Sequence, residues 1–395
     1  MKRFLYKQLV EHVDKRQISL VIGARQVGKT TLLKQLQLKL KTDNKSVHYF
    51  SLEDIEILDL LDQTPKNLMQ LIERPDINRR VYVLIDEIQY LKNPSNFLKY
   101  HYDLYDNQIK FIVSGSSSFY IDSKFRDSLA GRKRIFELPV MSLKEVLYFK
   151  GENKLIPFMG KKDIPLLYRD RINSYFYEYL IYGGYPEVVL ADSLNEKKKI
   201  LKELAESYAK KDALESELTH PKAYLNLLKL LSARAGNLLN AHSLTSDVEI
   251  DVKTIQKYVW VMQKSFHLKL IYSFQKNISS EIRKMPKVYF CDLGLRNSFI
   301  NNFSPIALRV DKGVLLENYI FMVLEDNYGL DNVKFWRTNK KQEVDFVVQD
   351  DNGMWKAFEV KYSLDSFNRK KYNSFFANYP DIPFSVIDLQ SAISI

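Results

Sequence analysis

The residues with the clearest chemical pattern are Gly23–Thr30, which have the spacing G-x-x-x-x-G-K-[ST]. Glycines let backbone N–H groups close around a polyphosphate, the lysine reaches the β- and γ-phosphates, and the threonine hydroxyl can bind Mg²⁺. The apolar run Ile18–Ile22 before it is typical of a buried strand, and good helix formers follow over 31–40. A helix there would direct its positive N-terminus at the phosphates. The sequence therefore predicts a nucleoside triphosphate site whose contacts are Gly23, Ala24, Arg25, Gln26, Val27, Gly28, Lys29, Thr30 and Thr31.

Two acids at the end of an apolar strand provide the second pattern. The run Val81–Asp86 is followed directly by Glu87. A carboxylate at the carboxyl end of a strand beside a phosphate loop can hold Mg²⁺, directly or through water, and we predict this role for Asp86 together with Thr30. Glu87 is then placed to polarise the water that attacks the γ-phosphate. The pair predicts that the bound triphosphate is hydrolysed, with Lys29 and Glu87 as catalytic residues.

Two further residues are candidates for the same reaction. A serine-rich turn follows the strand 109–113, and in ATPases with a strand inserted between the two motifs a polar residue here contacts the γ-phosphate or the attacking water. We predict Ser116 for this role, with Ser114 as the alternative; a plain Ser/Gly turn also remains open. Arg132 precedes a strand over 134–138, and it could stabilise transition-state charge in a neighbouring subunit's site or simply form a surface salt bridge.

Composition limits the class of protein. The net charge of +11 favours polyanionic partners such as nucleic acid. The sequence has no apolar run of about 18 residues that would span a bilayer, and its start lacks a signal-peptide pattern. A single cysteine, Cys291, excludes an internal disulfide framework. We therefore expect a cytoplasmic protein without a membrane partner.

In their order, the loop at 23–30, the strand end at 85–89 and the segments 114–116 and 128–132 resemble the AAA-type ATPases of archaea and bacteria that carry a C-terminal domain of unknown function. Further matches are Tyr182–Glu187, Tyr208–Asp212, Phe290–Arg296 and Glu343–Val348. The resemblance implies ATP and Mg²⁺ as cofactors and a homo-oligomer, with a hexameric ring as one such form. It also implies a DNA-linked role. Preference for ATP over GTP comes from the resemblance alone.

The middle of the chain has the element order of a winged helix. We expect helices over 222–235, 240–248 and 252–266, then strands over 268–274 and 287–290 around a basic loop. In this interpretation the third helix lies in a DNA major groove and the loop contacts phosphates. The predicted DNA contacts are Lys253, Gln256, Lys257, Lys264, Arg283 and Lys284. A solvated lysine face and a winged helix that docks protein are the alternatives.

The C-terminal part carries Asp345, then Glu359 and Lys361, with residues 346–358 between the two acids. Alternation along a strand places Glu359 and Lys361 on one face, and with Asp345 two carboxylates can hold a divalent ion. Glu317 on the preceding helix is a candidate third ligand. The spacing resembles the PD-(D/E)XK nuclease-like fold, although Val344 replaces the usual proline and an exposed strand with alternating charges is the alternative. The expected elements are a helix over 314–327, strands over 333–337, 344–348 and 355–360, a helix over 363–378 and a strand over 383–388.

These predictions define an α/β protein: a P-loop doubly wound parallel sheet with a helical lid, then a winged helix and a restriction-endonuclease-like α/β domain. The length of 395 residues suits several domains. The predicted boundaries are 1–145 for the ATPase core, 146–215 for the lid, 216–288 for the winged helix and 289–395 for the nuclease-like domain.

Three functional hypotheses follow. The favoured one is an ATP-hydrolysing enzyme that remodels or translocates on duplex or branched DNA in recombination, repair or mobile-element control. The second is an ATP-gated, metal-dependent DNA nuclease. The third is a nucleotide-switched signalling or scaffold protein whose winged helix binds protein.

Overall fold

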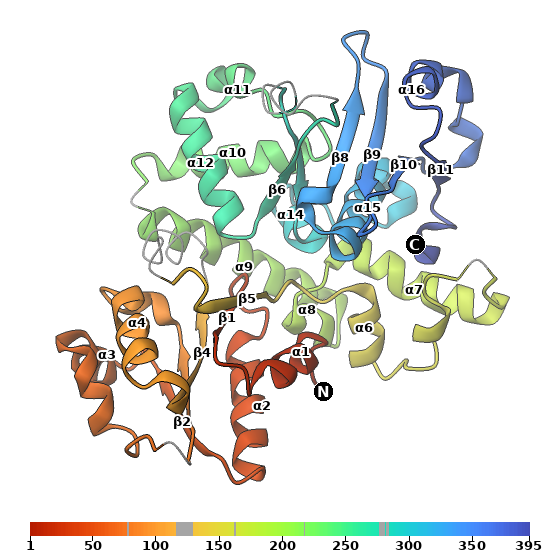
Figure 1. Cartoon of the computed structure of the whole chain (residues 1–395). Helices are drawn as coiled ribbons and strands as arrows, with labels where there is room; N and C mark the ends of the chain where they lie inside the picture. Colours follow the sequence, from red (N-terminus) through yellow and green to blue (C-terminus); the bar gives the residue numbers. More distant parts are fainter. Residues whose placement is uncertain (77–78, 116–128, 162, 217, 276–280, 282–283) are drawn as a thin grey trace. The chain divides into compact units, whose positions relative to one another are not determined.

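The computed structural model describes residues 1–76, 79–115, 129–161, 163–216, 218–275, 281 and 284–395 (Figure 1). The chain divides into two compact units. The first contains Met1–Met141 and Lys264–Phe266, and the second contains Ser142–Gln263 and His267–Ile395. In the described part of the chain, every helix is too short or too polar to cross a membrane.

The first unit is built on a five-stranded sheet in the order β2-β3-β4-β1-β5, with all neighbours parallel. Every residue of β1, β3 and β4 is buried, as their continuous apolar runs predict. Strand β4 lies between β1 and β3, so the strand before the glycine loop and the strand before the acids are separated by one inserted strand. The predicted parallel sheet is confirmed. The strands are β1 (Ile18–Ile22), β2 (Ser46–Ser51), β3 (Val81–Asp86), β4 (Ile109–Gly115) and β5 (Lys133–Glu137).

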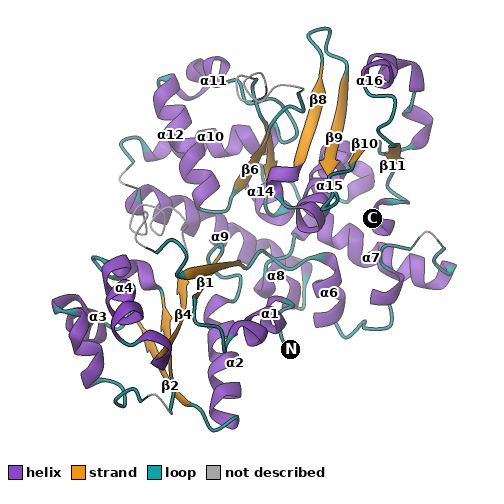
Figure 2. Cartoon of the chain, in the orientation of Figure 1, coloured by secondary structure: helices purple, strands orange, loops and turns teal. Residues whose placement is uncertain are grey.

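Helices cover both faces of this sheet, with α2 and α4 on opposite sides of the strands (Figure 2). Helix α2 buries four leucines at helical spacing, which gives it one apolar face toward the sheet. The helices are α1 (Leu5–His12), α2 (Lys29–Thr42), α3 (Ile55–Gln63) and α4 (Pro94–Leu104), with short 3-10 turns at Pro65–Gln70, Ile88–Tyr90 and Asp106–Gln108.

The second unit begins with helices. A capping box at Ser142 and Glu145 starts the first of them, because each side chain accepts the other residue's backbone N–H. The helices of this part are α6 (Leu143–Phe149), α7 (Leu166–Tyr182), α8 (Pro186–Leu190), α9 (Leu194–Glu215) and α14 (Leu293–Phe299).

Two sequence motifs more than a hundred residues apart lie against each other here. Asp292 caps α14 and also accepts a hydrogen bond from the Gly184 N–H at 2.7 Å. A Cβ at Gly294 would overlap the carbonyl oxygen of Tyr182, and a Cβ at Gly183 would overlap the Asp292 carboxylate. These glycines are therefore explained by close packing of α14 on the end of α7.

A buried cluster of charges fixes the chain after α14. Arg309 donates to Asp311 at 2.8 Å, and Arg296 pairs with the same carboxylate. Both arginines are almost fully buried. Burial alone would raise the pKa of Asp311, but the hydrogen bonds from Arg309 and Arg296 outweigh it and lower the pKa to about 2. Breaking this cluster would leave two buried cations without their shared anion.

Three helices and a strand pair follow the element order predicted for a winged helix. They are α10 (Pro221–Ala233), α11 (Ala241–Val248), α12 (Val252–Lys264), β6 (Leu268–Ile271) and β7 (Lys287–Phe290). The two strands are antiparallel, with Leu268 opposite Phe290. Helix α12 buries Ile255, Tyr258 and Met262, whose helical spacing places them on one face.

The C-terminal sheet has the order β11-β10-β9-β8. Strand β9 is antiparallel to β8 and β10, whereas β11 is parallel to β10. Helix α15 contacts β8, β9 and β10, and strands β8 and β9 lie side by side in Figure 1. The elements are α15 (Lys312–Tyr328), β8 (Val333–Arg337), β9 (Glu343–Gln349), β10 (Trp355–Val360), α16 (Asn373–Asn378) and β11 (Phe384–Ile387).

Two predictions for this region are wrong in detail. The single helix expected over 363–378 is three short pieces, because Ser363 and Asn368 each accept a nearby backbone N–H and start a new turn. The strand expected over 268–274 ends at Ile271, and the chain then pairs with β8, where the Phe335 N–H donates to the Tyr272 carbonyl at 3.1 Å. Tyr289 on β7 also packs against Phe346 on β9, with ring centroids 5.5 Å apart, so the strand pair packs against the C-terminal sheet.

Candidate nucleotide-binding site

The glycine loop joins the end of β1 to the start of α2, as predicted. Gly23 lies so close to the Leu138 carbonyl oxygen that a Cβ at this position would overlap it. Gly28 caps α2 with a φ of 100°, a conformation that disfavours other residues. Both glycines are thus required by the path of the backbone, and that path leaves the N-terminus of α2 facing the loop.

Lys29 is the first residue of α2 and is only 4% exposed. Its Nζ donates to the carbonyl oxygens of Gly23 at 3.0 Å and Ala24 at 2.7 Å. Burial lowers the pKa of Lys29 to about 8, and the charges of Glu87 and Asp86 only partly oppose this shift. A buried ammonium held by carbonyl dipoles would gain charge stabilisation from a phosphate, so the site fits a polyphosphate group.

Asp86 is held in place by groups from two neighbouring strands. Tyr49 on β2 donates its hydroxyl to Asp86 Oδ2 at 3.0 Å, and the Ser114 hydroxyl on β4 donates to Oδ1. Asp86 and Ser114 are both buried. Burial, followed by the charge of Asp86, raises the pKa of Tyr49, which keeps this hydroxyl protonated as a donor. Asp86 is therefore an oriented carboxylate at the carboxyl end of β3.

Glu87 adopts a left-handed backbone conformation with φ 57°. Its N–H donates to the Ser114 hydroxyl at 3.2 Å, and the Gln89 amide contacts its carboxylate. Since a non-glycine residue with positive φ is strained, the surrounding contacts must hold this turn. Ser114 thus links both acids, whereas the predicted Ser116 lies outside the described residues.

Arg3, close to the N-terminus, braces the glycine loop. Arg3 is 7% exposed and donates to the carbonyl oxygens of Val27 at 2.7 Å and Pro139 at 2.8 Å. It therefore ties the glycine loop to the segment after β5. The sequence gives no signal for this role, because an arginine beside the N-terminus usually lies on the surface.

Arg132 lies at the opposite edge of the sheet from the glycine loop. It directly precedes β5, which pairs in parallel with β1, and it forms a salt bridge with Asp103 at 2.9 Å. The five residues of β1 separate the two edges by roughly 16 Å. Arg132 is therefore too far from the nucleotide site of its own subunit. Its two predicted roles, in a neighbouring subunit's site or in a surface salt bridge, both remain open.

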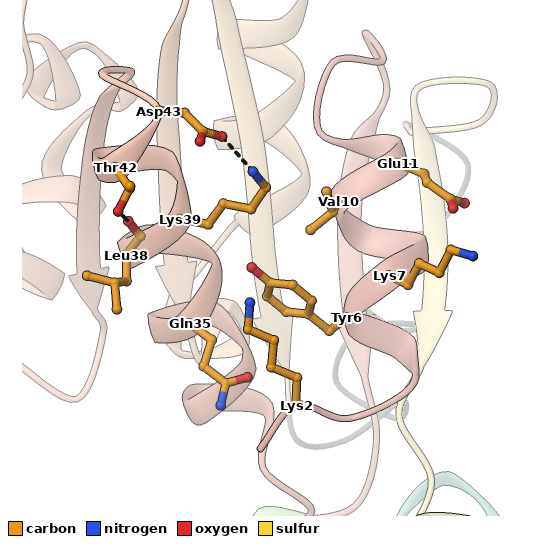
Figure 3. Close-up of a pocket in the computed structure, with 10 residues that line it drawn as sticks. All are labelled: Lys2, Tyr6, Lys7, Val10, Glu11, Gln35, Leu38, Lys39, Thr42 and Asp43. Carbon is orange, nitrogen blue, oxygen red and sulfur yellow. Dashed lines mark hydrogen bonds and ion pairs between the residues drawn. The ribbon is translucent and has the colours of Figure 1, made fainter.

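A separate hollow of about 730 Å³ lies between α1 and α2 (Figure 3). Lys39 and Asp43 form a salt bridge of 2.7 Å at its wall. None of the residues that line it is a predicted nucleotide contact. Its lining residues are Lys2, Tyr6, Lys7, Val10, Glu11, Gln35, Leu38, Lys39, Thr42 and Asp43.

The predicted DNA contacts divide into two groups. Lys253, Gln256 and Lys257 are exposed on α12, and Lys264 at its end is half-buried. In the strand-pair loop Arg283 lies outside the described residues. Lys284 donates to the Arg337 carbonyl at 3.2 Å, which directs it toward β8.

The C-terminal acids are only partly brought together. The Asp345 N–H donates to Glu359 at 3.3 Å, and Lys361 contacts Glu359, as strand alternation predicts. Glu317 instead accepts a hydrogen bond from Lys287 at 3.1 Å. Across the described residues, no three His, Cys, Asp or Glu side chains gather closely enough to hold a metal ion.

Comparison with known families assigns the first region. Residues 15–147 match the AAA domain family, which supports an AAA-type ATPase with the glycine loop and both acids inside the match. Residues 173–305 match a domain of unknown function (DUF8612), and residues 312–390 match another (DUF4143). These two matches do not decide between a winged helix, a nuclease-like domain and other folds.

Similar proteins extend over most of the chain. An uncharacterized protein of Methanocaldococcus jannaschii is 26% identical over 361 residues, covering 90% of this chain and 76% of that protein. An uncharacterized protein of Haemophilus influenzae is 24% identical over 376 residues, covering 91% and 85%. Among solved structures, the RuvB Holliday junction branch migration motor of Thermotoga maritima has a TM-score of 0.35 at 15% identity, and the match covers 67% of this chain and 88% of that one.

Proposed function

We propose that the chain hydrolyses ATP and couples this reaction to DNA bound by its second unit, as a remodelling or translocating enzyme in recombination, repair or mobile-element control. The observation that carries the proposal is the orientation of Asp86 and Glu87 by Ser114, at the same sheet edge as the buried Lys29. Two oriented acids beside a buried lysine and a glycine loop suit phosphoryl transfer to water.

Each group has a distinct role in this mechanism. Backbone N–H groups of 23–28 and the N-terminus of α2 surround the phosphates. Lys29 exchanges its carbonyl contacts for phosphate oxygens. The Thr30 hydroxyl and Asp86 would hold Mg²⁺, which neutralises charge on the β- and γ-phosphates when bound. Glu87 accepts a hydrogen bond from the attacking water and orients it in line with the γ-phosphate.

Arg132 extends the proposal to a homo-oligomer. Because Arg132 is far from the glycine loop of its own subunit, it could act only on a γ-phosphate bound by a neighbouring subunit. Its side chain is 32% exposed, as required for reaching across an interface. In such an assembly the arginine would exchange Asp103 for transition-state charge.

The DNA part of the proposal rests on α12 and on overall charge. Lys253, Gln256 and Lys257 form an exposed polar face on a helix that buries its other side, and the chain carries a net charge of +11. Lysines on such a face suit phosphate contacts, which weaken with salt as counterions are released. The nearby Trp260, 40% exposed, favours a protein partner as the second candidate, because exposed aromatic residues are enriched at protein interfaces.

The test measures ATP turnover of the full chain alone and with single-stranded, duplex and branched DNA. We expect one DNA form to raise turnover, and we expect DNA affinity to fall steeply between about 50 and 200 mM salt. The double variant Lys253→Ala/Lys257→Ala should reduce the steepness of that dependence, whereas Lys229→Ala, an exposed lysine on α10, should not. Equal turnover with every DNA form, together with no DNA binding at about 50 mM salt, would redirect the proposal to the protein partner.

A further inference from the structure

A buried lysine lies beside two of the three carboxylates that the nuclease-like interpretation assigns to a divalent cation. Lys287 on β7 is 2% exposed, and its Nζ lies 2.6 Å from Glu343, 3.1 Å from Glu317 and 3.7 Å from Asp345. The carboxylates come from α15 and β9, whereas the ammonium comes from the strand pair. Lys287 thus lies within 3.7 Å of Glu317 and Asp345, which are two of the predicted metal ligands, and of Glu343.

Other groups of the protein also donate hydrogen bonds to Asp345 and Glu317, and to the third predicted ligand, Glu359. Asp345 Oδ2 accepts the Val360 N–H at 2.8 Å, and Glu359 accepts the Tyr372 hydroxyl at 2.7 Å. Tyr289 donates to Glu317 at 2.6 Å. A divalent ion needs several oxygen ligands converging within about 2.0–2.6 Å, and the lone pairs that accept these hydrogen bonds are not available to it.

The distances from Lys287 Nζ to the carboxylates also fit an ammonium that donates hydrogen bonds to them. Charge-assisted N–H···O bonds run at about 2.7–2.9 Å, and two of the three Lys287 contacts are close to this range. A Cβ at Gly236 would lie 3.3 Å from Glu317 Oε1, so the backbone packs closely over this carboxylate. The geometry is that of a satisfied buried ion cluster, in which each charge has partners.

We propose that Lys287 replaces the divalent cation of this centre, so that the C-terminal sheet folds around an internal ammonium and does not cut nucleic acid by metal-dependent chemistry. The same contact joins β7 to α15 and β9. It therefore fixes the strand pair that follows α12 to the C-terminal sheet. This inference is independent of ATP hydrolysis in the first unit.

The test uses the full chain without nucleotide and follows its thermal midpoint with and without Mn²⁺. We expect no Mn²⁺ response in the wild type. Lys287→Met should lower the midpoint by at least about 5 °C, because it leaves buried carboxylates without their cation, and Mn²⁺ should restore part of the loss. Adding Asp345→Asn should remove that restoration. The matched control is Lys269→Met, which breaks the pair between Lys269 on β6 and Glu325 on α15. It should lower the midpoint with no Mn²⁺ response.

Two results would overturn the inference. One is a folded Lys287→Met variant that gains no response to Mn²⁺. The other needs no lysine variant: Mn²⁺ binding or Mn²⁺-dependent DNA cleavage by the wild type that Asp345→Asn abolishes. The second measurement keeps the inference falsifiable even where Lys287→Met does not fold.

Discussion

Replacing Ser114 by alanine removes the hydroxyl that joins the two acids of the nucleotide site. This side chain is fully buried, donates to Asp86 and accepts the Glu87 N–H at 3.2 Å. The substitution leaves the half-buried Glu87 N–H without this acceptor and the buried Asp86 carboxylate without this donor. Such losses cost about 1–3 kcal/mol of the free energy of unfolding.

The effect on catalysis should be larger than the effect on folding. Groups that orient a metal-binding carboxylate typically change activity by about 10–100-fold when removed. We therefore expect Ser114→Ala to lower the kcat of ATP hydrolysis by about 10–100-fold. ATP binding should change much less, because Lys29 and the glycine loop remain.

Ser19→Ala provides the matched control. Ser19 is a buried serine on the neighbouring strand β1, and its hydroxyl lies 2.8 Å from His12 Nδ1 rather than near the acids. Urea unfolding should give both variants a similar loss of stability, whereas turnover should fall only in Ser114→Ala. If Ser114→Ala kept turnover within about twofold of the Ser19→Ala variant, the orientation of Asp86 and Glu87 by Ser114 would have no catalytic importance.

The remaining predictions concern the second unit and the oligomer. Asp311→Ala should lower the free energy of unfolding by about 3–5 kcal/mol, because two buried arginines lose their anion. Because the folded-state pKa of Asp311 is lowered to about 2, its contribution to the free energy of unfolding should be full above about pH 4 and lost as pH falls through 2. Urea unfolding of the wild type and Asp311→Ala over a pH series measures this contribution. The same stability difference at pH 2 as at neutral pH would contradict the prediction. Gly294→Ala should lower the free energy of unfolding by about 1–3 kcal/mol, because the added Cβ overlaps the Tyr182 carbonyl, whereas Gly313→Ala has open space and should not destabilise the protein. Equal thermal midpoints of the two variants would disprove the packing argument. Mixing Glu87→Gln with Arg132→Ala should restore some ATP turnover, since one interface type then has both intact residues; a mixture no more active than its parts would exclude the action of Arg132 on a neighbouring site.

The proposed nucleotide site could be predicted because its signals are local in the sequence. A continuous apolar run, a glycine loop and a helix lie next to one another in the sequence, and the acids directly end another buried strand. Parallel pairing then brings both strand ends to one edge of the sheet. Sequence neighbours alone were therefore enough to predict Lys29, Asp86 and Glu87.

The groups that hold these residues could not be predicted in the same way. Tyr49 and Arg3 act through contacts made only after the sheet has formed, and neither stands in a recognisable pattern. The choice between Ser114 and Ser116 depends on where β4 ends. Ser114 is the last residue but one of β4 and lies beside Asp86.

The C-terminal region shows the same division. Its strands follow from their apolar runs, but Ser363 and Asn368 restart the chain where propensity predicted one long helix. Lys287 precedes Glu343 by more than fifty residues, and their ion pair depends on how the strand pair packs against β9. Spacing therefore predicted the acids and missed the cation among them.

The most direct test of the proposed ATPase is turnover by the purified full chain beside Glu87→Gln, with ATP binding measured in both. We expect the wild type to hydrolyse ATP with Mg²⁺, and we expect Glu87→Gln to bind ATP but lose about 10²–10⁴-fold in turnover. Turnover in Glu87→Gln equal to that of the wild type would contradict the account. Absence of turnover in the wild type with Mg²⁺ and each form of DNA would do so as well.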